Sequence, residues 1–326
     1  MKLYGARLQQ KGEIVPRDIA WEWKATGWYV EPRNAREVMN VVGAIGVYSI
    51  GQRFAWRGMS SADYTLISSL QRKLGNSRDE EALREAELET LRKARAWGLG
   101  VQPTGHVDDL QLLSDLQHYG IATRLLDFTS NPMTALWFAC QAPNGDVAKS
   151  GLLVAMNTKG WPTYSTVGAA NLTTWGQQAD PAGARLRSAL SGGAPFLVES
   201  ANPNERLRAQ EGFFVASAAP GPRKSTQVPL AGTSSISHLE IIDISPFDAL
   251  KVEYPRGNHD ELYKRLTEER QRGRPSALPF VAVIIRANLK PKLLRYLEST
   301  YNRSARVLFP DYAGFLEYGE APHRPE

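Results

Sequence analysis

The segment Phe54-Ala55-Trp56-Arg57-Gly58 combines an apolar run with a permanently charged guanidinium and a glycine. An arginine at the end of a strand presents a planar fork of donors that suits a phosphate or a carboxylate. The glycine after it allows a ligand to approach the backbone closely. Pairing of Arg57 with a carboxylate of the core explains the segment equally well, so both interpretations remain open.

A second polar block covers residues 117–130, between two apolar helical stretches. Such a density of polar side chains is unusual for a plain connector, and we expect it to contribute to a binding site. Structural roles compete with this interpretation: Asp127 could pair with Arg124, and Ser130 or Asn131 could cap the next helix. The side chains of interest are His118, Tyr119, Arg124, Asp127, Thr129 and Ser130.

Familiar catalytic signatures are absent from the sequence. It has no Gly-rich nucleotide loop, no HExxH pair and no GxSxG elbow. The five histidines have no ligand spacing, so we expect no metal site. Cys140 is the single cysteine and follows an apolar helical stretch, which predicts a buried thiol and not a nucleophile.

The elements that must position these residues follow from apolar spacing and capping signals. Helices are predicted at 35–45, 78–97, 108–119, 132–140, 260–270 and 290–299. Strands are predicted at 151–156, 195–199, 213–217, 238–244 and 280–286. The stretches 161–194 and 218–234 are predicted to be long loops or insertions. Helices early and strands late indicate an α+β fold.

Composition places the chain among ordinary globular proteins. It has 326 residues, 42% hydrophobic and 22% charged, with a net charge of +5 and a pI near 9.2. No apolar run of 18 residues and no leader pattern occurs, so we expect a cytoplasmic protein without membrane contact. The modest basic balance permits an acidic or phosphate-rich partner.

The motifs resemble those of the FRG-domain family. The resemblance rests on the segment 54–58, on QHYGIATRLLDFTSNPMTALWFA at 117–139, on NERLRAQEG at 204–212 and on LFPD at 308–311. It implies an N-terminal extension at 1–34 that packs on the core, an FRG domain at 35–320 and a flexible tail at 321–326.

The order of these motifs is similar to that of ADP-ribosyltransferases, which use NAD as substrate. The similarity implies a mixed or antiparallel sheet with helices packed on it. Arg57 would bind the pyrophosphate, and Gln210 or Glu211 would stabilise the positive ribosyl transition state. The nucleotide would also contact Gly58, His118, Tyr119, Arg124, Thr129 and Ser130.

The leading hypothesis is therefore an NAD-consuming ADP-ribosyltransferase-like enzyme that modifies RNA, DNA or protein. A toxin or antiphage effector restrained by an inhibitory antitoxin or chaperone-like partner would follow, because such an activity endangers its own cell. The alternatives are a non-enzymatic nucleotide- or nucleic-acid-binding module, with phosphate contacts from Arg57, His118 and Arg124, and a hydrolase that uses His118 with Asp127. An enzyme should bring Arg57, the 117–130 block and Gln210 or Glu211 to one cleft.

Overall fold

A computed structural model describes residues 28–48, 53–62, 64, 66–75, 77, 79–102, 105–142, 149–159, 161–166, 190, 195–218 and 280–319. Among them, no helix is long and apolar enough to span a bilayer. The predicted strand at 238–244 and helix at 260–270 lie outside the described residues, as does most of the two predicted loops.

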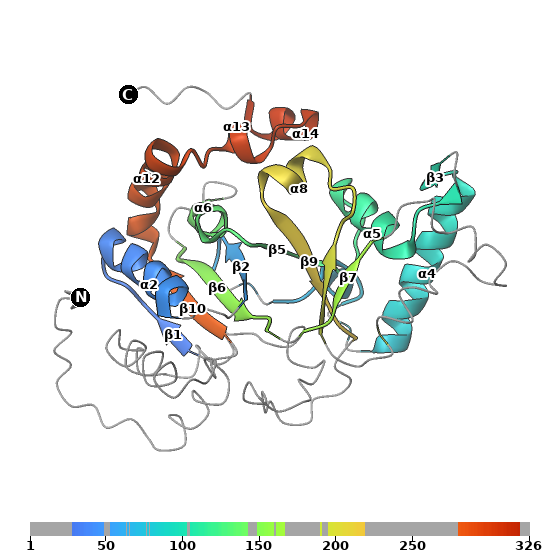
Figure 1. Cartoon of the computed structure of the whole chain (residues 1–326), viewed down its shortest axis with the longest axis horizontal. Helices are drawn as coiled ribbons and strands as arrows, with labels where there is room; N and C mark the ends of the chain where they lie inside the picture. Colours follow the sequence, from blue (N-terminus) through green and yellow to red (C-terminus); the bar gives the residue numbers. More distant parts are fainter. Residues whose placement is uncertain are drawn as a thin grey trace, which may run out of the picture.

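The centre of the protein is a mixed sheet of eight strands in the order β1-β10-β6-β2-β5-β9-β8-β7 (Figure 1). The inner pairs are antiparallel, and the two outermost pairs, β1 with β10 and β7 with β8, are parallel. The strands are β1 (Trp28–Val30), β2 (Phe54–Met59), β5 (Leu126–Thr129), β6 (Gly151–Asn157), β7 (Thr163–Ser165), β8 (Phe196–Glu199), β9 (Gly212–Ala216) and β10 (Phe280–Ile285), with a separate ribbon of β3 (Val101–Gln102) and β4 (Gly105–His106). The predicted α+β class with a mixed sheet is confirmed.

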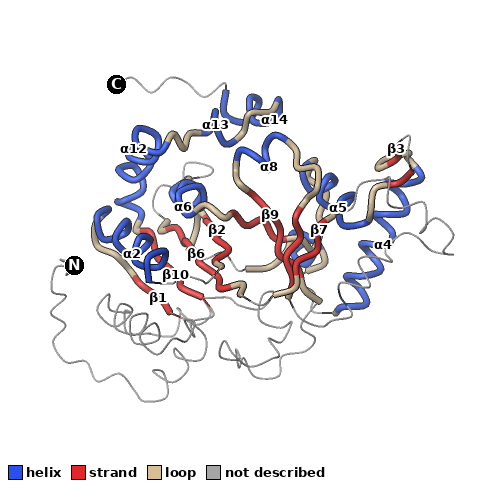
Figure 2. The backbone as a smooth tube through the Cα atoms, viewed as in Figure 1, coloured by secondary structure: helices blue, strands red, loops and turns tan. Residues whose placement is uncertain are grey.

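Helices surround this sheet (Figure 2). In Figure 1, α2 and α12 lie near β1 and β10 at one end of the sheet, whereas α4 and α5 lie at the other end, near β7. The helices are α2 (Ala35–Tyr48), α3 (Ser69–Lys73), α4 (Glu80–Ala96), α5 (Asp109–His118), α6 (Pro132–Cys140), α8 (Glu205–Ala209), α12 (Lys290–Tyr301), α13 (Ala305–Leu308) and α14 (Tyr312–Gly314), with a 3₁₀ turn η3 (Ala287–Leu289) and a π turn η4 (Phe315–Gly319).

Two buried clusters show how the alternation of the strands divides the core. One joins α2, α6 and α12 to Trp56, Leu153 and Val283. Another places α5 against the inward side chains of β8 and β9, including Val198 and Phe214. Successive strand residues point to opposite faces, so β2, β6, β8, β9 and β10 each contribute to two clusters.

Several predicted boundaries agree closely with the structure. The side chain of Asp108 caps α5, Asn131 caps α6, and Gly120 has the left-handed φ of +85° that ends α5. The prediction of a long loop or insertion at 161–194 missed residues 163–165, where β7 adds an edge strand beside β8. A strand of three residues is too short to show a periodicity that could be recognised from sequence.

Candidate functional site

A cavity of about 270 Å³ lies between β2, β5, α5, α6 and α8. Seven of the lining residues are apolar or glycine and nine are polar or charged, so the wall is more polar than that of most small-molecule sites. The lining residues are Trp56, Arg57, Gly58, Ser114, Gln117, His118, Asp127, Phe128, Thr129, Ala135, Phe138, Asn204, Arg206, Leu207, Gln210 and Phe214.

The sheet opens beside this cavity, between β2 and β5. Strand β2 pairs with β6 over six positions but with β5 only at Trp56 and Thr129. Beyond that pair, the backbone carbonyl of Asp127 accepts a hydrogen bond from Arg57 Nη1. The guanidinium thus takes the place of a backbone partner in the ladder.

Arg57 has more donors than partners. Its Nη1 also lies 3.8 Å from Asp127 Oδ2, and its guanidinium carbon lies 5.9 Å from the centre of the Phe128 ring. Its Nε is buried and has no hydrogen-bond partner within the described part of the chain. Burial lowers the pKa of Arg57, partly offset by Asp127, while Arg72 lowers the pKa further. This incompletely compensated cation is suited to an anionic ligand.

Gly58 contributes close packing between β2 and α6. A Cβ atom at this position would lie 1.8 Å from the carbonyl oxygen of Ala135 and 2.6 Å from the amide nitrogen of Ala139. The glycine therefore lets the helix backbone approach the strand, whereas the sequence suggested that its small size serves a ligand. Since α6 contributes Ala135 and Phe138 to the cavity, this packing also shapes the site.

The polar wall of the cavity is organised by Gln117. Its amide nitrogen donates to Asp127 Oδ1 at 2.8 Å, and its carbonyl oxygen accepts from the hydroxyl of Thr123, which is completely buried. The amide is thereby fixed with its donor side toward the Asp127 carboxylate. The sequence placed Gln117 in the polar block but gave it no role.

The C-terminal segment packs beside the cavity through three lining residues. His118 Nε2 lies 3.6 Å from Asp311 Oδ2, and Gln210 Nε2 donates to the carbonyl of Leu308 at 3.0 Å. The guanidinium of Arg206 stacks on the ring of Phe309, 4.2 Å from its centre. The proposed hydrolase pair is not formed, because His118 contacts Asp311 and not Asp127.

Gln210 and Glu211 diverge although they are adjacent in the chain. Gln210 lines the cavity, and its backbone carbonyl accepts from the hydroxyl of Thr129 at 2.7 Å. Glu211 has a left-handed φ of +50°, and its carboxylate accepts from Asn131 Nδ2 at 2.7 Å and from Arg303 Nη2 at 2.8 Å. The Glu211 side chain does not belong to the cavity wall.

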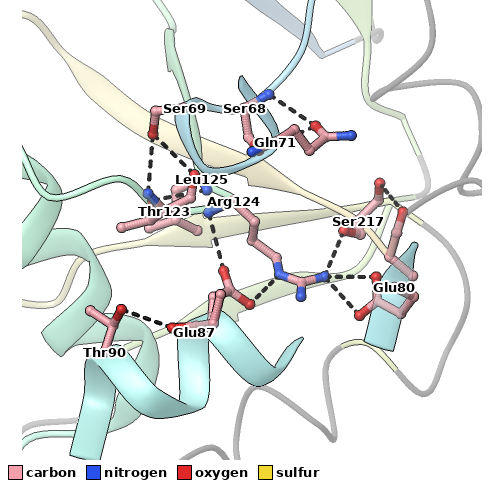
Figure 3. A network of polar contacts seen from close by, with 12 residues as sticks. Ser68, Ser69, Gln71, Glu80, Glu87, Thr90, Thr123, Arg124, Leu125 and Ser217 are labelled. Carbon is pink, nitrogen blue, oxygen red and sulfur yellow. Dashed lines mark hydrogen bonds and ion pairs between the residues drawn. The ribbon is translucent and has the colours of Figure 1, made fainter. Parts of the chain in front are cut away.

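Arg124 lies in a buried network away from the cavity (Figure 3). It is 1% exposed and donates through Nε to Glu87 and through Nη1 to Glu80 and the carbonyl of Ser217. Burial opposes its charge, but the Glu87 and Glu80 carboxylates together raise the pKa of Arg124. The alternative pairing of Asp127 with Arg124 is not formed.

The structure thus brings together five of the nine residues to which the motif order assigned NAD binding or catalysis. Arg57, Gly58, His118, Thr129 and Gln210 line the cavity. The other four do not, and these are Tyr119, which is 82% exposed, Arg124, Ser130 and Glu211.

Sequence reasoning assigned no role to Arg206, which lines the cavity. Its place in the 204–212 motif was the signal that could have identified it. Within the described ranges, no group of three or more His, Cys, Asp or Glu side chains is arranged to hold a metal ion.

Comparisons with known proteins give one family assignment. Searches of curated proteins and of solved structures found no match. The model of the FRG domain matches residues 52–147, which include β2, the 117–130 block and α6. Four of the five elements around the cavity, β2, α5, β5 and α6, therefore lie within the residues that match the FRG-domain model.

Proposed function

We propose that the Arg57 cavity binds NAD and that the protein is an ADP-ribosyltransferase-like enzyme acting on a macromolecule. The observation that carries this proposal is the buried Arg57 Nε without a hydrogen-bond partner in the described chain. A phosphate oxygen at this edge would supply the missing acceptor, and arginine is well suited to such bidentate contacts.

The arrangement of the strands supports the same proposal. The three motifs of the transferase-like order lie on adjacent strands: Arg57 on β2, Thr129 on β5, and Gln210 just before β9. Register pairs Trp56 with Thr129 and Thr129 with Gly212, so the motifs meet at one place in the sheet. The enzyme hypothesis requires this convergence.

In the proposed complex, Arg57 holds the pyrophosphate and Arg206 offers a second guanidinium on the same cavity wall. His118 and Phe138 supply ring surfaces for the base or the nicotinamide. The acceptor is RNA, DNA or a protein side chain. A toxin or antiphage role with an inhibitory partner belongs to the same proposal, because uncontrolled NAD consumption would harm the cell.

A non-enzymatic nucleotide-binding module is the second candidate. The observation in its favour is that Glu211, the carboxylate suggested by the motif order, is engaged by Asn131 and Arg303. Such a module would use the same Arg57 cavity for a phosphate but would leave NAD intact.

The test is incubation of the purified protein with NAD labelled in its adenylate half and with separate pools of protein, RNA and DNA. Arg57→Ala should abolish transfer of label. Arg53→Ala is the matched control, because Arg53 precedes the same strand, pairs with Glu199 and does not line the cavity. Binding of NAD without cleavage or transfer would favour the second candidate. If the protein neither binds nor cleaves NAD, the NAD proposal is refuted.

A further inference from the structure

Asp127 is the one acidic side chain among the described residues that line the cavity. Its side chain is 66% exposed, so a ligand can reach the carboxylate. Glu211 lies outside the wall and accepts two hydrogen bonds there. A negative charge in this cavity therefore has to come from Asp127.

The Asp127 carboxylate is held in one orientation. Gln117 donates to Oδ1, and the buried Thr123 hydroxyl fixes the Gln117 amide from the other side. Oδ2 lies 3.8 Å from Arg57 Nη1, beyond hydrogen-bond distance. A negative group thus stands beside a positive group in the cavity.

We infer that Asp127 is the catalytic carboxylate of the proposed reaction and that Glu211 is a structural residue. The inference rests on the proposed function. NAD carries an anionic pyrophosphate and a cationic nicotinamide ring, and Arg57 and Asp127 offer the cavity one group of opposite charge to each of them. Preorganised charges aimed at developing charge are the largest common source of transition-state stabilisation.

The reaction step is a substitution at C1′ of the nicotinamide ribose. The bond between C1′ and the ring nitrogen breaks, and its electron pair leaves with neutral nicotinamide. A nucleophilic oxygen or nitrogen of the acceptor bonds to C1′ and loses its proton to water. Positive charge on the ribose rises as the bond breaks, and Asp127 stabilises it.

The same carboxylate distinguishes the two redox forms of the ligand. Oxidised NAD has a positively charged ring, and the reduced form has a neutral one. Asp127 attracts only the first, so the protein should bind NAD more tightly than NADH. That preference is a binding property and can be measured without turnover.

The experiment measures nicotinamide release and the affinities for NAD and NADH in wild type, Asp127→Asn, Asp127→Glu and Glu211→Gln. Asp127→Asn should lower release roughly 100-fold and bring the two affinities close together. Asp127→Glu should restore part of the rate, and Glu211→Gln should remain within a few-fold of wild type. Thermal melts verify that each variant is folded.

Full turnover and an unchanged NAD preference in folded Asp127→Asn would overturn the assignment, as would loss of turnover in folded Glu211→Gln alone. The wild-type protein tests the proposed function separately. If wild type neither binds nor cleaves NAD, the proposed function itself fails, together with the inference that depends on it.

Discussion

Arg124 and Glu87 form an ion pair in the interior, with 2.6 Å between Nε and Oε2 and each side chain 1% exposed. The pair joins α4 to the chain just before β5 (Figure 3). Arg124→Met leaves the buried Glu87 carboxylate without its counter-charge, and Glu87→Leu leaves the buried Arg124 with Glu80 alone. Each variant should therefore lower the free energy of unfolding, Arg124→Met by about 3–5 kcal/mol and Glu87→Leu by somewhat less.

The double variant Arg124→Met/Glu87→Leu should recover much of that loss, because no charge of the pair is then stranded. Urea unfolding measures all three free energies. Arg84→Ala, which removes a partly exposed pair with Glu81, is the control and should change stability by less than about 1 kcal/mol. Equal losses in Arg84→Ala and Arg124→Met would contradict the structural role of Arg124.

Gly58 and Gly43 provide a matched pair of glycine-to-alanine changes. Gly58→Ala drives a Cβ into the backbone of α6 and should cost at least about 3 kcal/mol. A Cβ on Gly43, inside α2, meets no atom within 4 Å, so Gly43→Ala should stabilise the helix by about 0.5–1 kcal/mol. Thermal unfolding of both variants checks the opposite signs, and a stable Gly58→Ala would refute the close packing.

Cys140 should give the protein a measurable pH dependence above pH 9. Its thiol is buried, as expected from the sequence, and burial raises its pKa from 9.0 to about 12, although Lys290 lowers it somewhat. The unfolded chain thus releases this proton at lower pH than the folded chain. Between these values Cys140 should reduce stability by about 1.4 kcal/mol per pH unit as pH rises.

Urea unfolding at pH 8, 9 and 10 gives the free energy of unfolding of wild type and of Cys140→Ala. The contribution of the thiol is the difference between the pH slopes of these two free energies. Other groups titrate in both proteins and cancel in this difference. The thiol should also resist alkylation at pH 8 until the protein is unfolded. Rapid modification of the native protein would contradict its burial.

Arg57 should contribute to ligand binding but should not stabilise the folded protein. Its guanidinium is largely buried, its Nε has no partner among the described residues, and burial lowers its pKa. Arg57→Met should therefore be as stable as wild type, or more stable by roughly 1 kcal/mol. A melting temperature several degrees below that of wild type would show instead that Arg57 chiefly holds β2 and β5 together.

Local signals determined the elements around the site. The capping aspartates of α4 and α5, the order of acidic and basic residues along α4, and Gly120 all act within one or two turns, so they can be recognised without a fold. The segment 54–58 and the 117–130 block were singled out as candidate site segments for the same reason, and residues of both line the cavity. The same motifs predicted the FRG-domain match found at residues 52–147.

Only the tertiary structure decided which charged residues face the cavity. The sequence gives no reason to treat Arg57 and Arg124 differently. In the structure, Arg124 pairs with Glu87 and Glu80, which lie 37 and 44 residues away in the chain. Arg57 contacts Asp127, which lies 70 residues away. Gln210 and Glu211 are adjacent in the chain, but the Gln210 side chain lines the cavity and the Glu211 side chain does not. Pairings of this range depend on how the sheet and helices pack, and no local pattern encodes them.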